Sequence, residues 1–135
     1  MEITKQDIDA MSRTIYGEAR GETDAGKLAV GHVIYNRALR GGWWGETIEE
    51  VCKKEWQFSC WNDDDPNRIK IKVVDASNSD ARDCLWAALA VTQKKHPDNT
   101  NGSCHYHHFD IRPNWSADKK PVTQIGNHLF YNDVE

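Results

Sequence analysis

The sequence has no long hydrophobic run and no excess of positive charge. A membrane-spanning helix needs about 18 consecutive apolar residues, and no stretch of the chain approaches that length, so we expect no membrane insertion. Lys and Arg number 17 against 21 Asp and Glu, which gives a net charge of −4. This balance argues against nucleic acid as a partner, because phosphate backbones select basic surfaces.

Two further signals are missing. Residues 1–5 lack the basic and apolar regions of a secretory signal peptide, so we expect a protein made in the cytoplasm. The four cysteines, at positions 52, 60, 84 and 104, form no CxxC pair, which leaves zinc-ribbon and thioredoxin-type motifs without support. Disulfides are possible in more than one connectivity, but without a signal peptide we expect reduced thiols at the site of synthesis.

The chain length of 135 residues corresponds to one domain, and no repeat, linker or low-complexity tract divides it. Capping residues and hydrophobic periodicity predict four helices: from Thr4 to about Ala19, from Thr23 or Asp24 to Gly41, a short one from Thr47, and one that opens at Ser77 and Asp80 and ends before Pro97. Aromatic-rich runs at 104–109 and 128–131 predict two strands. We therefore predict a single α+β domain over residues 1–135, mainly helical with a small β or irregular C-terminal part.

Two glutamates, Glu18 and Glu22, lie four residues apart at the end of the first predicted helix, and each follows a glycine. A glycosidase needs a carboxylic acid that stays protonated near neutral pH. The negative end of a helix dipole favours that state, because it disfavours a nearby carboxylate. The alternative is that both are solvated residues at a helix end, which is where most charged side chains lie.

Six blocks of sequence, taken in order, resemble the cell wall hydrolase family that includes the spore-cortex-lytic enzymes. They are Tyr16-Gly17-Glu18-Ala19-Arg20-Gly21-Glu22, Ala29-Val30-x-x-Val33-x-x-Asn36-Arg37, Gln57-Phe58-Ser59-Cys60-Trp61-Asn62, His105-Tyr106-His107, Pro113-Asn114-Trp115 and Gly126-Asn127-His128-x-Phe130-Tyr131. The resemblance runs from about Ile8 to Tyr131. This chain departs from the family pattern at Trp43-Trp44, where relatives usually show an aromatic-proline pair, and at His108-Phe109-Asp110.

The resemblance implies a lysozyme-like fold akin to lytic transglycosylases and cleavage of peptidoglycan glycan strands between N-acetylmuramic acid and N-acetylglucosamine. It places the family's catalytic glutamate on Glu18 and gives Glu22 a supporting role. One strong glutamate without a clear partner fits a lytic transglycosylase better than a hydrolase, since hydrolysis needs a second carboxylate at a defined distance. No cofactor and no metal are expected.

The remaining polar and aromatic residues of these blocks are candidates to stack on pyranose rings or to hydrogen-bond acetamido and hydroxyl groups. The predicted substrate-binding residues are Tyr16, Gln57, Phe58, Trp61, Asn62, Tyr106, His107, Trp115, His128 and Tyr131. For each one, the alternative is a structural role in a loop or in the core. Trp86, beside Leu85 and Leu89 on the fourth predicted helix, is expected in the core.

The best candidate for a metal site is the run Cys104-His105-x-His107-His108, where a strand would place His105 and His107 on one face. Two convergent ligands are fewer than zinc requires. A zinc-dependent cell-wall amidase and a non-catalytic glycan-binding module are the alternatives to a glycosidase.

The small size and the missing signal favour a monomeric phage endolysin or virion lysin that acts on the cell wall, in the periplasm or delivered by the virion.

Overall fold

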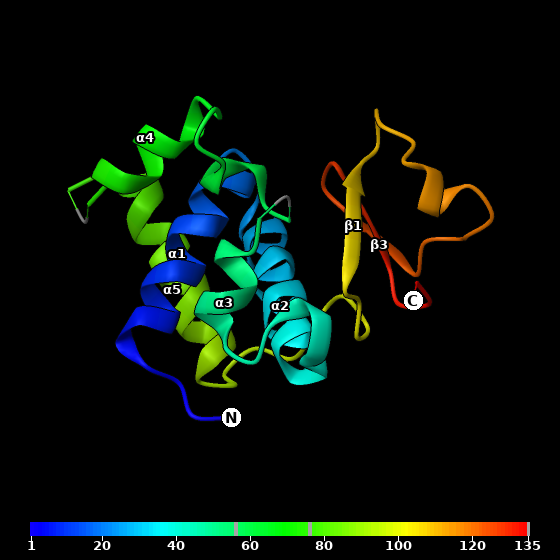
Figure 1. Cartoon of the computed structure of the whole chain (residues 1–135), viewed down its shortest axis with the longest axis horizontal. Coiled ribbons are helices and arrows are strands. Elements are labelled where there is room, and N and C mark those ends of the chain that lie inside the picture. The colour runs from blue at the N-terminus through cyan, green and yellow to red at the C-terminus, as the bar shows by residue number, and fades with distance from the viewer. Residues whose placement is uncertain (56, 76, 135) are drawn as a thin grey trace.

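The computed structural model describes residues 1–55, 57–75 and 77–134, which form a helical part and a small sheet beside it (Figure 1). The helices are α1 (Lys5–Ala19), α2 (Asp24–Arg40), α3 (Ile48–Lys53), α4 (Asn67–Val73) and α5 (Ser79–Thr92). The strands are β1 (His105–His108), β2 (Thr123–Ile125) and β3 (His128–Tyr131). Short 3₁₀ turns lie at Gly42–Trp44, Ser59–Trp61 and Asn114–Ser116. The prediction of a mainly helical α+β domain is confirmed.

Three of the four predicted helices begin at the expected capping residues. The Thr4 side chain accepts from Asp7 N while the Asp7 carboxylate accepts from Thr4 N, which completes a capping box. Thr23 and Thr47 cap α2 and α3 with the side-chain bond alone: each accepts from the backbone N of the third helical residue, Gly26 and Glu50. The fourth predicted helix, α5, begins one residue later than expected, because the side chain of Asn78 rather than Ser77 accepts from the backbone of the first turn.

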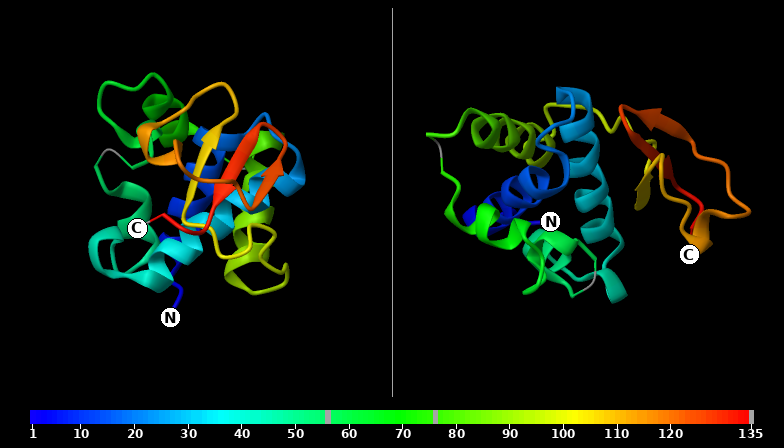
Figure 2. Two further views of the ribbon diagram at one scale, coloured as in Figure 1. Left: turned by 90° about the vertical axis from the view of Figure 1, so that its right-hand side faces the viewer. Right: turned by 90° about the horizontal axis from the view of Figure 1, so that it is seen from above.

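Helix α2 lies between the other helices and the sheet, as the right-hand view of Figure 2 shows. One side of α2 packs with α1, α3 and α5 around the main core. On another side, Ala29 and Val33 are fully buried against Phe130 of β3. A helix that is covered on several sides has apolar residues around most of its circumference. Because α2 packs on both α1 and β3, it fixes the position of the sheet relative to α1.

The sheet has the order β1-β3-β2, and both pairings are antiparallel. Tyr106 pairs with Phe130 and His108 pairs with His128. Because side chains alternate along a strand, Tyr106, His128 and Phe130 share one face of the sheet. Phe130 packs against α2, so this is the inner face, and His105, His107 and Tyr131 lie on the outer face.

Two elements and one side chain differ from the sequence prediction. Strand β2 and helix α4 were not predicted: β2 is very short, and α4 buries only Ile71 while Ile69 and Val73 stay exposed, so neither shows a regular hydrophobic period. The prediction that Trp86 lies in the core is wrong, since its side chain is 49% exposed. Helix α5 buries Cys84, Ala87, Ala88 and Val91, and position 86 falls outside that stripe.

All four cysteines are buried and free of disulfide bonds. Burial raises the pKa of the thiols of Cys52 and Cys84 to about 12. A thiol with such a pKa is a poor nucleophile and acts as a small apolar core residue. Among the helices in the described ranges, none is long and apolar enough to cross a membrane.

Candidate active site

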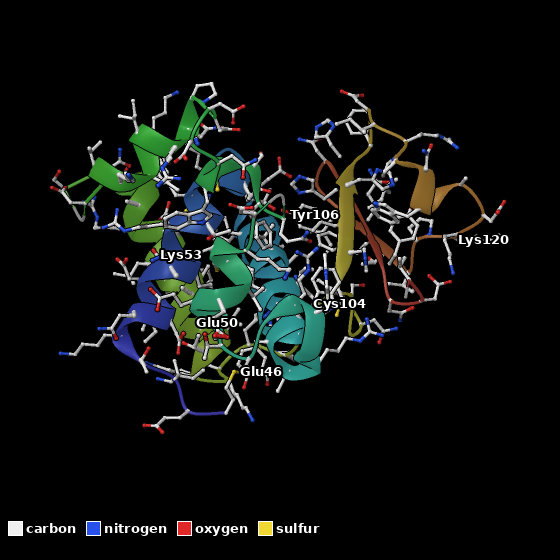
Figure 3. All side chains as sticks on the ribbon, viewed as in Figure 1. Glu46, Glu50, Lys53, Cys104, Tyr106 and Lys120 are labelled. Carbon is white, nitrogen blue, oxygen red and sulfur yellow. The ribbon has the colours of Figure 1, made fainter. Side chains whose placement is uncertain are left out.

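Glu18 lies in the last turn of α1 and faces the sheet. Its Oε1 accepts a hydrogen bond of 2.9 Å from the phenolic Oη of Tyr106, which belongs to the inner face of β1. Figure 3 shows Tyr106 between the helical part and β1. Residues 88 positions apart in the sequence therefore meet in one polar contact.

The pKa of Glu18 is raised above its ordinary value, mainly because burial removes the carboxylate from water. The Tyr106 hydrogen bond opposes this shift, since it stabilises the charged form. Asp65 adds a smaller upward effect and Arg37 a smaller downward one. The result is a carboxyl group whose neutral form extends toward neutral pH, which is what a general acid requires.

Tyr106 is held by aromatic contacts with the same face of the sheet. Its ring stacks on Phe130 at a centroid distance of 5.6 Å and meets His128 edge-on at 5.0 Å. Burial, followed by the charge of Glu18, raises the pKa of the Tyr106 phenol well above its ordinary value. The phenol therefore stays protonated and acts as a hydrogen-bond donor to Glu18.

Glu22 has different partners from Glu18. Its two carboxylate oxygens accept from the backbone N and the side-chain Nδ2 of Asn127, each at 3.0 Å, and Oε1 lies 4.0 Å from His128 Nδ1. Burial alone would raise the pKa of Glu22, but the two Asn127 hydrogen bonds, together with His128 and His108, bring it below its ordinary value. Glu22 is thus a carboxylate that ties the α1–α2 connection to the β2–β3 turn.

A cavity of about 680 Å³ opens between the helical part and the sheet, next to Tyr106. Three indole rings line it, those of Trp43, Trp44 and Trp115. The guanidinium of Arg37 stacks on Trp44 at 4.2 Å from the ring centroid, and its Nε donates to Cys104 O at 2.8 Å. The cavity is completed by Gln57, His105, Tyr106 and Val134. Aromatic walls with few polar groups suit a sugar ring.

The structure brings only some of the predicted substrate-binding residues to this cavity. Gln57, Tyr106 and Trp115 line it directly. Trp61 and Asn62 line a separate cavity of about 460 Å³, and Trp61 Nε1 donates to Thr14 Oγ1 at 2.8 Å. Phe58 is 1% exposed and belongs to the core.

The other predicted binding residues either pack against residues that line the cavity or lie away from it. His107 and Tyr131 stack on each other, share a 2.8 Å hydrogen bond and hold the Trp115 ring on the outer face of the sheet. His128 packs on Tyr106 from the inner face. Tyr16 is largely buried under the Arg20 guanidinium, near α5.

Five lining residues were not among the predicted binding residues: Arg37, Trp43, Trp44, His105 and Val134. Arg37 was quoted in the family resemblance, and the two tryptophans were noted only as a departure from the family pattern. These residues come together at the cavity because the Gly42–Trp44 turn packs on β1. The ring centroids of Trp44 and His105 are 5.2 Å apart. The spacing of residues along the chain carries no signal for that contact.

The histidines of β1 do not converge. His105 and His107 share the outer face, as predicted, but His107 has a protein partner at each ring nitrogen: Tyr131 Oη at Nε2 and His108 O at Nδ1. His108 lies on the other face, near Asp110. Within the described residues, no group of three or more His, Cys, Asp or Glu side chains is arranged to hold a metal ion.

The sequence profile of the cell wall hydrolase family matches residues 21–131 of the chain. The chain belongs to the cell wall hydrolase family. This match confirms the resemblance found in the sequence blocks. It includes Glu22 and the aromatic blocks, whereas Glu18 lies just before its first residue.

Curated proteins named spore cortex-lytic enzymes are similar over most of this chain. The spore cortex-lytic enzyme of Oceanobacillus iheyensis is 29% identical over 133 residues, which cover 94% of this chain and 42% of that protein. The spore cortex-lytic enzyme of Halalkalibacterium halodurans is 28% identical over 127 residues, covering 93% and 34%. The chain thus spans less than half the length of these curated relatives.

Two solved structures share the fold of this chain. The catalytic domain of the Bacillus cereus SleB protein aligns with a TM-score of 0.73 and 25% identity, covering 96% of this chain and 91% of that one. The catalytic domain of the germination-specific lytic transglycosylase SleB from Bacillus anthracis aligns with a TM-score of 0.72 and 25% identity, covering 95% of each. The expected lysozyme-like fold is confirmed.

Proposed function

We propose that this chain cleaves the glycan strands of bacterial peptidoglycan between N-acetylmuramic acid and N-acetylglucosamine, as a lytic transglycosylase with Glu18 as acid and base. The observation that carries the proposal is the Glu18–Tyr106 contact beside the aromatic cavity. The fold shared with a lytic transglycosylase from Bacillus anthracis supports it. No cofactor takes part in the proposed reaction.

In the proposed reaction, protonated Glu18 gives its proton to the glycosidic oxygen while the bond to C1 of N-acetylmuramic acid breaks. The Glu18 carboxylate then takes the proton of the C6 hydroxyl as that oxygen bonds to C1 of the same sugar. The products are a 1,6-anhydro-N-acetylmuramic acid end and an N-acetylglucosamine end. Tyr106 matters in the second step, because its hydroxyl stabilises the carboxylate that forms.

Glu22 is a positioning residue in this proposal. Its carboxylate holds Asn127 at the turn before β3, and the next residue, His128, packs on the ring of Tyr106. Glu22 therefore acts on Glu18 through the sheet. Its lowered pKa keeps it ionised, which suits a hydrogen-bond acceptor and not a proton donor.

The Glu18→Gln variant tests the role of Glu18. The amide keeps the shape of the side chain and can still accept from Tyr106, but it has no proton to give. We expect release of sugar ends from purified peptidoglycan to fall roughly 10²–10⁴-fold, with an unchanged circular dichroism spectrum. A folded variant with near-native activity would remove Glu18 from the mechanism.

The mass of the released ends tests the reaction type. A lytic transglycosylase produces muramic acid ends that are lighter by one water than hydrolysed ends. Reducing muramic acid ends would instead mean hydrolysis, and Glu22 or Asp110 would then be the candidate bases. Asp110 lies near His108 on the loop after β1 and is exposed.

Chelation separates this proposal from a zinc-dependent amidase. We expect treatment with EDTA to leave both activity and melting temperature unchanged, since a structural or catalytic zinc would couple metal removal to loss of one or both. Activity that is lost with EDTA and restored by zinc would favour the amidase. Binding to peptidoglycan without any cleavage would favour the glycan-binding module.

The biological setting is also a proposal. We expect a monomer, which size-exclusion chromatography with light scattering tests. We also expect a lysin of a phage or virion, and the genes that flank its coding sequence test that expectation.

A further inference from the structure

Trp43 is unusual among the residues that line the cavity because its side chain is 64% exposed. Its neighbour Trp44 packs against the Arg37 guanidinium and the His105 ring. Trp43 meets the Trp44 ring edge-on, at a centroid distance of 5.0 Å, and the Lys54 ammonium group on its face. The indole of Trp43 therefore contributes little to the core, yet the Gly42–Trp44 turn holds it at the wall of the cavity.

The turn that carries Trp43 is built to hold a fixed shape. Gly41, Gly42 and Gly45 have φ values of 64°, 61° and 122°, a region that side chains disfavour. Gly42 N donates to Glu46 Oε1 at 3.2 Å, so the carboxylate of Glu46 stabilises the turn. A fixed aromatic ring loses little freedom when it binds a ligand.

A cation lies beside the Trp43 ring, while the carboxylates of Glu46 and Glu50 accept hydrogen bonds from backbone N–H groups of the same turn and of the segment that follows it. Lys54 Nζ lies 4.7 Å from the centroid of the Trp43 ring, and within the described part of the chain it forms no ion pair. Lys54 does not itself line the cavity, whereas Arg37 does, and no Asp or Glu side chain of the described residues lines it. The two cations, Lys54 beside Trp43 and Arg37 in the cavity wall, favour an acidic ligand.

We propose that Trp43 and Lys54 form an accessory subsite for a sugar that carries a carboxylate, with the indole against the pyranose ring and the ammonium group facing the acid. The proposal rests on the proposed function, because it takes the glycan strand as the occupant of the cavity. In peptidoglycan this chemistry belongs to the muramic acid residue, either in its lactyl group or in its attached peptide. The subsite adds affinity and sugar preference without touching Glu18.

Binding to insoluble peptidoglycan measures the subsite in a Glu18→Gln background, in which the proposed function predicts that the ligand stays intact. We expect Trp43→Ala to raise the apparent Kd about five- to tenfold, as for loss of one aromatic stacking contact. Trp43→Phe keeps a stacking face and should retain most of the affinity. The matched control is Trp86→Ala, which removes an exposed tryptophan of α5 that does not line the cavity, and should bind like the parent.

The charge of Lys54 is tested separately. We expect Lys54→Gln to weaken binding about threefold at low salt, with the difference disappearing at high salt. The control is Lys120→Gln, because Lys120 is exposed on the loop beyond the sheet, on the side away from the helices (Figure 3). Thermal unfolding checks that all five variants keep their fold, which their exposed or partly exposed positions favour.

Three ligands separate the sources of the acid. On neutral chitin oligosaccharides, Trp43→Ala should still weaken binding and Lys54→Gln should not. An effect of Lys54→Gln on glycan strands stripped of peptide assigns the acid to the lactyl group, and an effect only on intact peptidoglycan assigns it to the peptide. Either result supports the subsite.

The proposal is overturned if Trp43→Ala binds like Trp86→Ala, or if Lys54→Gln binds like Lys120→Gln on both acidic ligands. This failure is distinct from failure of the proposed function. A parent chain that cleaves peptidoglycan while Trp43→Ala binds normally keeps the function and loses the subsite. A parent chain that binds through Trp43 and cleaves nothing keeps the subsite and loses the enzyme.

Discussion

At the scale of single residues, the environment of Glu18 makes opposing demands on its carboxyl group. Burial favours the neutral acid, and the Tyr106 hydroxyl favours the carboxylate. The acid–base role proposed for Glu18 needs both states within one turnover, so under that proposal the balance between them sets the pH range of activity. Two substitutions change this balance in different ways.

The first is Tyr106→Phe, which removes the hydrogen bond but keeps the ring that stacks on Phe130. The pKa of Glu18 should rise further, because the charged form loses its donor. The proposed mechanism needs protonated Glu18, so the alkaline limb of kcat/KM should move to higher pH. The maximal rate should fall about tenfold or more, since hydrogen bonds to charged groups are worth about 1.5–3 kcal/mol. A pH–rate profile that keeps its alkaline limb would separate Tyr106 from Glu18.

The second is Glu18→Gln, whose effect on the free energy of unfolding depends on pH. The pKa of Glu18 is higher in the folded chain than in the unfolded chain. The stability that protonated Glu18 contributes is therefore fully present below the pKa of the unfolded chain, and it is lost as the pH rises through the pKa of the folded chain. The amide resembles the protonated acid. We therefore expect the variant to be more stable than the parent at neutral pH, by about 1.4 kcal/mol for each pKa unit of the shift. Urea titrations at acid and neutral pH should show the two chains converging in acid.

At the scale of elements, two glycines of the Tyr16–Glu22 block have different surroundings. A Cβ on Gly17 would lie 2.6 Å from Cys60 Cβ and 2.7 Å from its Sγ, whereas a Cβ on Gly21 would meet nothing within 4 Å. Gly17 thus lets the Ser59–Trp61 turn pack directly on α1, next to Glu18.

We expect Gly17→Ala to destabilise the chain by about 1–3 kcal/mol, the usual range for overpacking, despite the higher helix propensity of alanine. Gly21→Ala is the control and should change stability by about 0.5 kcal/mol or less. Chemical denaturation measures both. Equal stability of the two variants would mean that the Ser59–Trp61 turn moves aside without a penalty.

The connection between α1 and the β2–β3 turn depends on Glu22. Gly126 has a φ of 57°, and a Cβ there would lie 2.5 Å from Glu22 Oε1, so the carboxylate and the turn fit closely together. In Glu22→Gln, the amide nitrogen faces a donor, either Asn127 N or Asn127 Nδ2.

We expect Glu22→Gln to lower stability at neutral pH by about 1 kcal/mol and to reduce activity less than Glu18→Gln does. The pKa of Glu22 is lowered in the folded chain, so its contribution is present above the unfolded pKa and is lost as pH falls through the folded one. Denaturation at neutral and acid pH should therefore show a difference that shrinks in acid. A larger activity loss than for Glu18→Gln would give Glu22 a direct catalytic role.

At the scale of the whole molecule, α2 couples two cores. The larger core lies among the helices, and the smaller one joins α2 to the sheet through Ala29, Val33 and Phe130. Tyr106 reaches Glu18 only while the sheet stays docked on α2, as the arrangement in Figure 2 illustrates. The Glu18–Tyr106 contact thus depends on a small patch of apolar surface.

Phe130→Ala tests this dependence. Phe130 is fully buried, so we expect a loss of about 3–5 kcal/mol and a fall in activity as Tyr106 loses its stacking partner. The control is Phe109→Ala, on the loop after β1, where the ring is 51% exposed and the change should be about 0.5 kcal/mol or less. Hydrogen exchange should show the sheet opening in Phe130→Ala while α1 and α5 stay protected.

The sequence alone determined the helix starts at Thr4, Thr23 and Thr47, the two longer strands and the family blocks, because caps, periodicity and motifs are local in the chain. The tertiary structure alone decided that Tyr106 meets Glu18, that Asn127 binds Glu22 and that Trp43 and Trp44 line the cavity. It also placed Trp86 outside the core, added α4 and β2, and put Trp61 in a separate cavity. The physical reason is that a site between a helix and a sheet forms when distant apolar surfaces are buried together, and no local pattern records which surfaces will meet.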